Sequence, residues 1–279
     1  MSIKIKKLTL GETLSLFALA LFLFVSLLNT TFYAKYVSGV VYYFIIITSI
    51  IFLVTKEIIS NKFNFQNTVS LFGILVVYVL VGSVAGFLST LAISSLFIFG
   101  LRNVPFRYVA RVSLYISLFI LIVVILSSKI GYIPNYVEFS LGRVRHFLGF
   151  RYSLFPSTVM LNIVAITLFL TQDKISYKRL FFLFVLTIWI FHQTDSRLTF
   201  IGSLLLLSIN LMMKWYPSFL ESSHFILKGF RFTYLINAYF SYLLAKMYLN
   251  FASSHLNDLS QKLNTFLGGR IYYANRSLS

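Results

Sequence analysis

The sequence contains no cysteine and few acidic residues. Its 279 residues include 7 Asp and Glu, 4 His and 4 Pro. Without cysteine there are no disulfides and no thiolate chemistry, and the scattered histidines lack the spacing of a metal site. There is also no paired-carboxylate DxD motif, no GxxxxGK[ST] phosphate loop and no serine-hydrolase elbow. These absences exclude the enzyme classes that such motifs mark, and we expect neither a metal nor a cofactor.

Hydrophobic residues dominate what remains. They make up 58% of the chain, and charged residues make up 11%, against about 25% in soluble domains. A membrane-spanning helix needs about 20 apolar residues, and such runs fill the sequence. We therefore predict an all-α polytopic integral membrane protein, a single transmembrane domain over residues 1–279 with about nine transmembrane helices. The predicted spans are Leu14–Leu28, Val37–Val54, Thr68–Val84, Phe87–Leu101, Val112–Ser128, Pro156–Thr171, Leu180–His192, Leu198–Met213 and Phe232–Leu249. The third and fourth come from one uncharged run, which we split at "VGSVAG".

The basic residues predict the orientation of these spans. The 24 Lys and Arg give a net charge of +17, and placing the N-terminus inside puts most of them in inner loops. Because the charges lie between spans, we expect membrane lipids rather than nucleic acid as their partner. Basic residues on the outer side gather in a loop at 129–155 and a segment at 250–279, where arginine outnumbers lysine. Arginine's planar fork suits bidentate phosphate binding.

The outer loop contains "LGRVRHFLGFRYSLFP". Val137, Leu141, Val144 and Leu148 follow helical spacing, which predicts an amphipathic helix in the membrane interface. Three basic residues lie on this predicted helix and one arginine follows it. All four could contact lipid phosphates or bind the phosphates of a lipid-linked substrate. They are Arg143, Arg145, His146 and Arg151.

A second segment, "HQTDSRLTF", joins two predicted helices. Asp195 and Arg197 are the only charged residues between Leu180 and Met213, and we expect the turn to lie near the hydrocarbon boundary. Charges at that depth are usually paired or functional, although Thr194, Asp195 or Ser196 could simply cap the next helix. By contrast, the inner-side acids Glu57, Asp173 and Glu221 are each isolated in the sequence.

The third segment is near the end of the chain. Leu256, Leu259, Leu263 and Phe266 predict another amphipathic helix, with Asp258 and Lys262 paired on it. Gly268 and Gly269 can end this helix. Arg270, Tyr272, Tyr273 and Arg276 follow, and the tyrosines could stack on a sugar ring.

Together, "LGRVRHFLGFRYSLFPSTVM", "TDSRLTFIGSLLLL" and "LNTFLGGRIYYANRSL" resemble three segments of Wzy-type repeat-unit polymerases of bacterial surface polysaccharides, within the O-antigen ligase-like superfamily. They occur in the family's order and cover most of residues 141–279. Two departures are that "SLFPS" stands where the family has an HPN-like triplet, and that the chain stops where members continue with further spans. The resemblance therefore implies a truncated chain.

The resemblance implies a multi-pass protein of the bacterial cytoplasmic membrane whose active face is extracytoplasmic. Its substrates would be undecaprenyl pyrophosphate-linked oligosaccharides, polymerised by metal-independent glycosyl transfer, with a flippase and a chain-length regulator as pathway partners. Substrate-binding residues would be Arg143, Arg145, Arg151, Arg270, Arg276, Tyr272 and Tyr273. Arg197 would stabilise the leaving group, and Asp195, Glu138, Asp258 or His146 would be the base, with Asp195 favoured for its depth.

Three other functions stay open. A ligase of the same superfamily would use the same arginines and a different acceptor. A flippase would need basic residues along a path at mid-membrane depth and repeated helices, and the sequence shows no repeat. A lipid-binding structural protein would tolerate lysine at each outer arginine.

Overall fold

In a computed structural model the chain is predominantly helical, with a single antiparallel hairpin in the part that is described. The structure describes residues 8–60, 65–140, 143–216, 233–248, 254–267 and 269–278. The elements are α1 (Leu10–Asn29), the 3-10 helix η1 (Phe32–Tyr36), α2 (Gly39–Ser60), α3 (Phe65–Ala85), α4 (Thr90–Gly100), α5 (Phe106–Ile130), β1 (Val137–Ser140), β2 (Arg143–His146), α6 (Phe155–Thr171), the 3-10 helix η2 (Gln172–Lys174), α7 (Tyr177–Thr194), α8 (Arg197–Trp215), α11 (Thr233–Lys246), α12 (Ser254–Phe266) and α13 (Arg270–Leu278).

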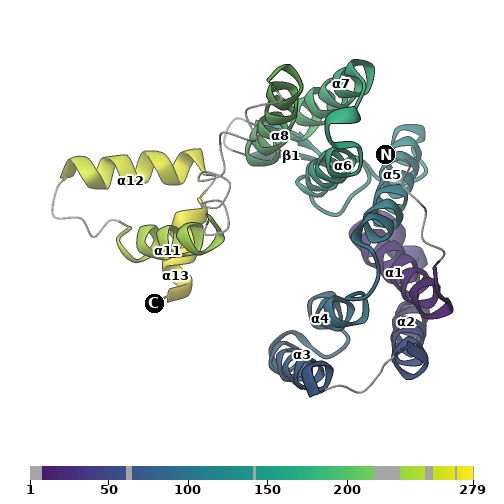
Figure 1. The fold of residues 1–279 in the computed structure, drawn as a ribbon. Helices are drawn as coiled ribbons and strands as arrows, with labels where there is room; N and C mark the ends of the chain where they lie inside the picture. The colour runs from purple at the N-terminus through teal and green to yellow at the C-terminus, as the bar shows by residue number, and fades with distance from the viewer. Residues whose placement is uncertain are drawn as a thin grey trace. The chain divides into compact units, whose positions relative to one another are not determined.

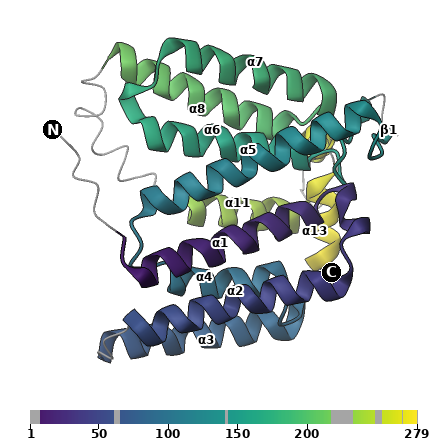
Figure 2. The same cartoon turned by 90° about the vertical axis from the view of Figure 1, so that its right-hand side faces the viewer.

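The chain divides into two compact units, Met1–Leu211 and Met212–Ser279 (Figure 1). In the first unit, α1 packs against α2 and α5, α3 against α4, and α6 against both α5 and α7. Figure 2 shows α1, α2, α5, α6 and α7 running side by side, with the β-hairpin at one end, here called the hairpin end. In the second unit α13 packs against α11 and α12. The prediction of a single membrane domain stays a prediction.

Each of the predicted spans coincides with a helix. Five of these helices, α1, α2, α3, α5 and α8, are long and apolar enough to cross a membrane. Two others, α4 and α6, are shorter apolar helices, and α4 with its 11 residues extends only about 16 Å. The structure therefore indicates an all-α protein embedded in a membrane, and nine crossings stay a prediction.

Local capping explains several helix ends. Thr9 and Glu12 form a reciprocal capping box at the start of α1, with the Thr9 amide donating to Glu12 Oε2 at 2.8 Å. The predicted break in the long uncharged run is confirmed: α3 ends at Ala85, Gly86 has φ 91°, and the Ser89 side chain caps α4. Glycine suits that position because left-handed backbone costs it little.

The predicted interfacial helix around residues 137–148 is wrong. Val137–Ser140 and Arg143–His146 are antiparallel strands, with Val137 opposite His146 and Glu138 opposite Arg145. Leu141, one of the four residues of the predicted stripe, lies outside the described residues. Val137 and Val144 fit a strand as well as a helix, because both lie on one face of the hairpin.

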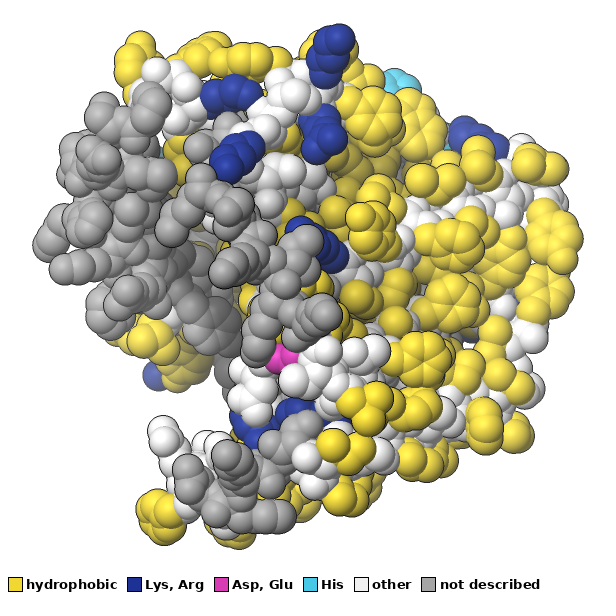
Figure 3. Space-filling view, turned by 45° about the vertical axis from the view of Figure 1, so that its right-hand side comes forward, with side chains coloured by type: hydrophobic (Ala, Val, Ile, Leu, Met, Phe, Trp, Pro, Cys, Tyr) yellow, Lys and Arg dark blue, Asp and Glu magenta, His cyan; other side chains and the backbone are white. Residues whose placement is uncertain are grey.

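Two buried apolar clusters hold the first unit together. One joins α5, α6, α7 and α8 through residues such as Val124, Met160 and Leu183. The other joins α1, α2 and α4 through residues such as Phe22, Ile46 and Phe97. The lateral faces of the helices stay apolar, and in α3 Gly82 is the one buried residue. Figure 3 shows hydrophobic side chains over much of the face in view, with lysine and arginine mainly in its left and upper parts. Such exposed apolar faces are what lipid-contacting helices require.

Candidate functional site

The hairpin gathers charged side chains on one of its faces. Cross-strand partners lie on the same face, and side chains alternate along each strand. Glu138, Arg143 and Arg145 therefore share one face, here called the polar face of the hairpin. The opposite face carries Val137, Phe139, Val144 and His146. Strand pairing thus converts a sequence of mixed polarity into an amphipathic surface.

The base of the hairpin is fixed to the end of α1. The Phe32 amide donates to the Gly149 carbonyl at 3.0 Å, and the Arg151 amide donates to the Thr30 carbonyl at 2.8 Å. Close by, the Asn135 side chain accepts from the Leu148 amide at 2.8 Å. The two backbone bonds tie the base of the hairpin to the residues between α1 and η1.

Gly149 lies where the base of the hairpin approaches α5 most closely. Its φ is 84°, and a Cβ there would lie 2.9 Å from Val124 Cγ1 and 3.0 Å from Ser128 Cβ. Both neighbours belong to α5. The glycine of the "LGF" sequence is therefore needed for conformation and for close approach of the loop to α5.

The sequence predicts a tight turn at residues 192–200, and the structure has this turn between α7 and α8, where it also meets the hairpin. Asp195 adopts the left-handed conformation with φ 43°, and its amide closes α7 on the Phe191 carbonyl at 2.8 Å. Asp is one of the few non-glycine residues that tolerate this conformation. The sequence predicts that Ser196 could cap α8 by accepting from a backbone amide. In the structure its hydroxyl hydrogen-bonds the Thr199 hydroxyl at 2.7 Å.

Three arginines and two carboxylates lie around this meeting point. Arg143 Nε is 3.4 Å from Asp195 Oδ2, and Arg197 Nε is 3.8 Å from Asp195 Oδ1. On the polar face, Arg145 Nη1 is 4.0 Å from Glu138 Oε2. The buried Ser153 hydroxyl donates to the same Glu138 oxygen at 3.5 Å. These contacts are loose, and the group carries one more positive charge than negative.

The arginines of the hairpin are sheltered, and Arg145 has an unused donor. The side chains of Arg143 and Arg145 are 18% and 17% exposed, against 43% for Arg197. Arg145 Nε is buried and has no hydrogen-bond partner among the described residues. A buried donor without a partner costs free energy, which an incoming acceptor would recover. The cluster is thus suited to an anion.

Two other candidates from the loop lie apart from this cluster. Arg151 is exposed, and its backbone amide bonds to Thr30. His146 lies on the opposite face of the hairpin from Glu138, because its cross-strand partner is Val137. Its Nδ1 is buried without a partner in the described part of the chain. The geometry does not bring His146 to Asp195 or Glu138.

The remaining candidates belong to the second unit. Arg270, Tyr272, Tyr273 and Arg276 all lie on α13, where the Tyr272 amide donates to Asn264 Oδ1 at 3.0 Å. The predicted helix at 256–266 is confirmed as α12, and so is its ion pair, with Lys262 Nζ 2.7 Å from Asp258 Oδ2. Participation of these residues in a site with Arg143 stays a prediction.

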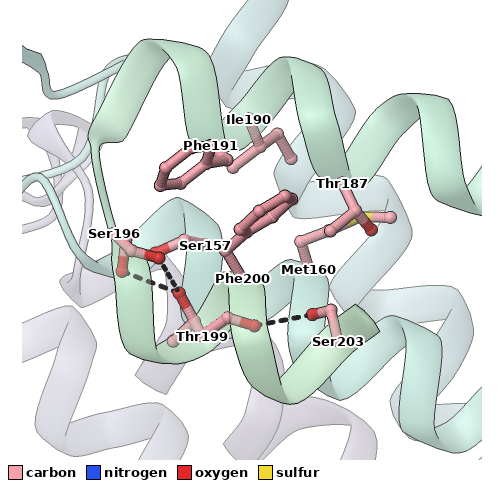
Figure 4. Close-up of a pocket in the computed structure, with 9 residues that line it drawn as sticks. All are labelled: Ser157, Met160, Thr187, Ile190, Phe191, Ser196, Thr199, Phe200 and Ser203. Carbon is pink, nitrogen blue, oxygen red and sulfur yellow. Dashed lines mark hydrogen bonds between the residues drawn. The ribbon is translucent and has the colours of Figure 1, made fainter. Parts of the chain in front are cut away.

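A small cavity lined by hydroxyl groups lies among α6, α7 and α8 (Figure 4). Its volume is about 10 Å³, close to the space that one water molecule needs. It is lined by Ser157, Thr187, Ser196, Thr199 and Ser203, together with Met160, Ile190, Phe191 and Phe200. The rings of Phe191 and Phe200 stack at 4.1 Å and join the two helices next to Asp195. The cavity is too small for a substrate, and its lining supports the turn that holds Asp195.

A second charged cluster, not predicted from the sequence, lies where α2 and α4 end. The expectation that Glu57 is isolated is wrong, because Arg102 binds its carboxylate through Nη1 at 2.8 Å and Nη2 at 2.9 Å. Lys56 Nζ, which is 1% exposed, lies 2.6 Å from Glu57 Oε1. Glu57 and Arg102 are 45 residues apart in the sequence. The one sequence signal for their contact is that both are predicted on the same side of the membrane. The Asp173 side chain and Glu221 lie outside the described residues.

Within the described ranges, no three His, Cys, Asp or Glu side chains are grouped as a metal site would require. The candidate site at the hairpin consists of guanidinium and carboxylate groups. Comparison with models of known protein families, with curated proteins and with solved structures gives no match.

Proposed function

We propose that the chain is a glycosyltransferase of the bacterial cytoplasmic membrane that polymerises undecaprenyl pyrophosphate-linked oligosaccharide units on the outer leaflet. The observation that carries the proposal is the junction of Arg143, Asp195 and Arg197, which joins two segments at the hairpin end. It provides guanidinium donors next to apolar helices, and a lipid pyrophosphate needs both kinds of surface. The three segments that resemble repeat-unit polymerases favour the same substrate.

In the proposed reaction, a hydroxyl oxygen of the acceptor glycan attacks the anomeric carbon of the donor. The bond from that carbon to the pyrophosphate oxygen breaks, and its electron pair leaves with the lipid pyrophosphate. Arg143, Arg145 and Arg197 would stabilise the negative charge that develops on the leaving oxygen. Arg270 and Arg276, on α13, stay predicted substrate-binding residues.

The acceptor hydroxyl must also lose its proton. Asp195 interacts with two guanidinium groups, so its oxygens are committed to orienting Arg143 and Arg197. Glu138 faces one guanidinium group, at 4.0 Å, and its side chain is 36% exposed, against 23% for Asp195. These contacts favour Glu138 over Asp195 as the proton acceptor, with Asp195 as a positioning residue.

The test uses cells that lack this gene and keep the rest of the glycan pathway. Their undecaprenyl-linked glycans would be extracted and sized by mass spectrometry. We expect single repeat units to accumulate on the carrier, with long chains restored by the wild-type gene and not by Arg197→Ala. Arg179→Ala is the matched control, because Arg179 is exposed near the start of α7, far along the helix from Asp195.

Other outcomes would assign the gene differently. Long chains that stay on the carrier would indicate a ligase, and repeat units trapped on the inner leaflet would indicate a flippase. Unchanged glycans, at verified loss of the protein, would refute the proposal and leave the arginines as lipid anchors.

A further inference from the structure

The polar face of the hairpin continues into an aromatic surface at its base. The Phe147 amide donates to the Tyr136 carbonyl at 2.9 Å, which extends the strand pairing by one residue pair. By the two-residue period of strands, Tyr136 and Phe147 therefore fall on the face of Glu138 and Arg145. Their rings are 6.3 Å apart, and the Tyr136 ring also contacts Phe32 at 5.0 Å. Arg143 follows on this face toward the tip of the hairpin.

Three more tyrosines gather beside this base. Tyr33 and Tyr36 come from η1, and Tyr132 directly follows α5. Their ring centroids form a triangle with sides of 6.1, 6.3 and 6.3 Å. The Tyr33 hydroxyl donates to Ser127 Oγ at 2.6 Å, which fixes this ring against α5. The cluster is thus held in place before any ligand arrives.

The outer rings of this surface remain accessible. Tyr36, Tyr132 and Tyr136 are 57%, 66% and 56% exposed. Individual tyrosines at a membrane boundary are common as anchors. Here, however, Tyr36 and Tyr132 contact each other, and Tyr136 lies on the hairpin face of Arg145 and Glu138, an arrangement that dispersed anchors would not need.

We propose that these aromatic residues form a saccharide-binding subsite for the glycan portion of the lipid-linked substrate. This inference rests on the proposed function and specifies how the sugar is held. A sugar ring has an apolar C–H face and a polar hydroxyl edge, which match a tyrosine's ring and hydroxyl. The end of β1, Ser140, is four positions after Tyr136, so the face extends roughly 13 Å from the aromatic base to the arginines near the tip. A short oligosaccharide can lie along it with its pyrophosphate at Arg143 and Arg145.

The subsite can be tested by binding, without catalysis. The full chain would be placed in lipid nanodiscs, and the probe is the oligosaccharide released by mild acid from the host's own lipid-linked glycans. We expect Tyr136→Ala to raise the Kd of this probe about threefold to tenfold, and Tyr136→Phe to keep it near the wild-type value. Tyr115→Ala is the matched control, because Tyr115 is 68% exposed within α5 and its ring stacks on no other aromatic ring among the described residues.

Tyr132→Ala is a second variant for the case that Tyr136→Ala does not fold, since the Tyr132 ring is the most exposed of the cluster. We expect the same weakening from it. Lack of probe binding by the wild-type chain, or equal Kd values for Tyr136→Ala, Tyr132→Ala and Tyr115→Ala, would overturn the subsite and leave the tyrosines as membrane anchors. The polymerase proposal fails separately, if deletion of the gene leaves the lipid-linked glycans unchanged.

Discussion

Replacing Gly149 by alanine should destabilise the first unit by two separable effects. The first is backbone strain, because φ is 84° and a non-glycine residue in left-handed backbone costs roughly 1–2 kcal/mol. The second is crowding. Ile133 Cδ1, 2.7 Å from the new Cβ, is the end of a flexible side chain, whereas Ser128 Cβ at 3.0 Å is fixed to the α5 backbone. Overpacking of this kind costs about 1–3 kcal/mol, so the total is about 2–5 kcal/mol.

Gly131→Ala isolates the first effect. Gly131 has φ 86° and no atom within 4 Å of a built Cβ, so its substitution adds strain without crowding. Unfolding would be followed on heating in detergent by the fluorescence of Trp189 and Trp215, the only two tryptophans in the chain. We expect Gly149→Ala to lower the apparent Tm roughly 5 °C further than Gly131→Ala does. Equal shifts would refute the crowding argument and the close approach of the loop to α5.

The remaining predictions concern charge and the membrane surface. Arg102→Ala should cost roughly 3 kcal/mol by leaving Glu57 with Lys56 alone, and adding Glu57→Gln should recover part of that loss in the same thermal assay. Arg143→Lys keeps the charge and loses the fork, so about tenfold less polymer is expected in the complementation assay, whereas full activity would show that charge alone suffices. Because the chain has no cysteine, single cysteines can be labelled cleanly. A polarity-sensitive dye at Leu259→Cys should report a less polar environment in nanodiscs than at Gln261→Cys, and equal emission would argue against an interfacial α12.

The helices could be predicted from the sequence because long apolar runs leave a membrane-embedded chain few alternatives. The run from Phe65 to Leu101 is a good case: it has no charge, it exceeds the length of one span, and it breaks at Gly86. The order α7, turn, α8 could also be predicted, since Asp195 and Arg197 interrupt a run that is otherwise uncharged.

The hairpin could not be derived with the same certainty. Val137 and Val144 occur at spacings that satisfy both a helix and a pair of strands, and a two-stranded hairpin is only marginally stable alone. What decides between them is tertiary: the loop is bonded to Thr30 and Phe32, more than 100 residues earlier in the chain, and β2 packs against α7. A local signal did exist, since Gly142 separates two stretches of alternating polarity.

Side-chain contacts between residues far apart in the sequence could not be predicted either. Arg143 and Asp195 were both predicted on one side of the membrane, but their contact at 3.4 Å depends on how α7 packs beside the hairpin. The bidentate bond between Arg102 and Glu57 is of the same kind. Orientation rules place a residue on a side of the membrane, and only packing selects its partner.

The two faces of the hairpin bear on the difference between arginines that bind substrate and arginines that anchor a protein to lipid. Val137, Phe139 and Val144 are 39%, 78% and 48% exposed on the apolar face, which suits contact with the membrane interface. An anchoring hairpin would direct its arginines to the headgroups around the protein. Here Arg143 and Arg145 lie on the other face, are mostly sheltered, and in the case of Arg143 contact Asp195. Because Asp195 and Glu138 hold these arginines close to the protein, the arginines bind lipid headgroups less well than exposed arginines would. The arrangement favours a ligand that binds on the polar face of the hairpin.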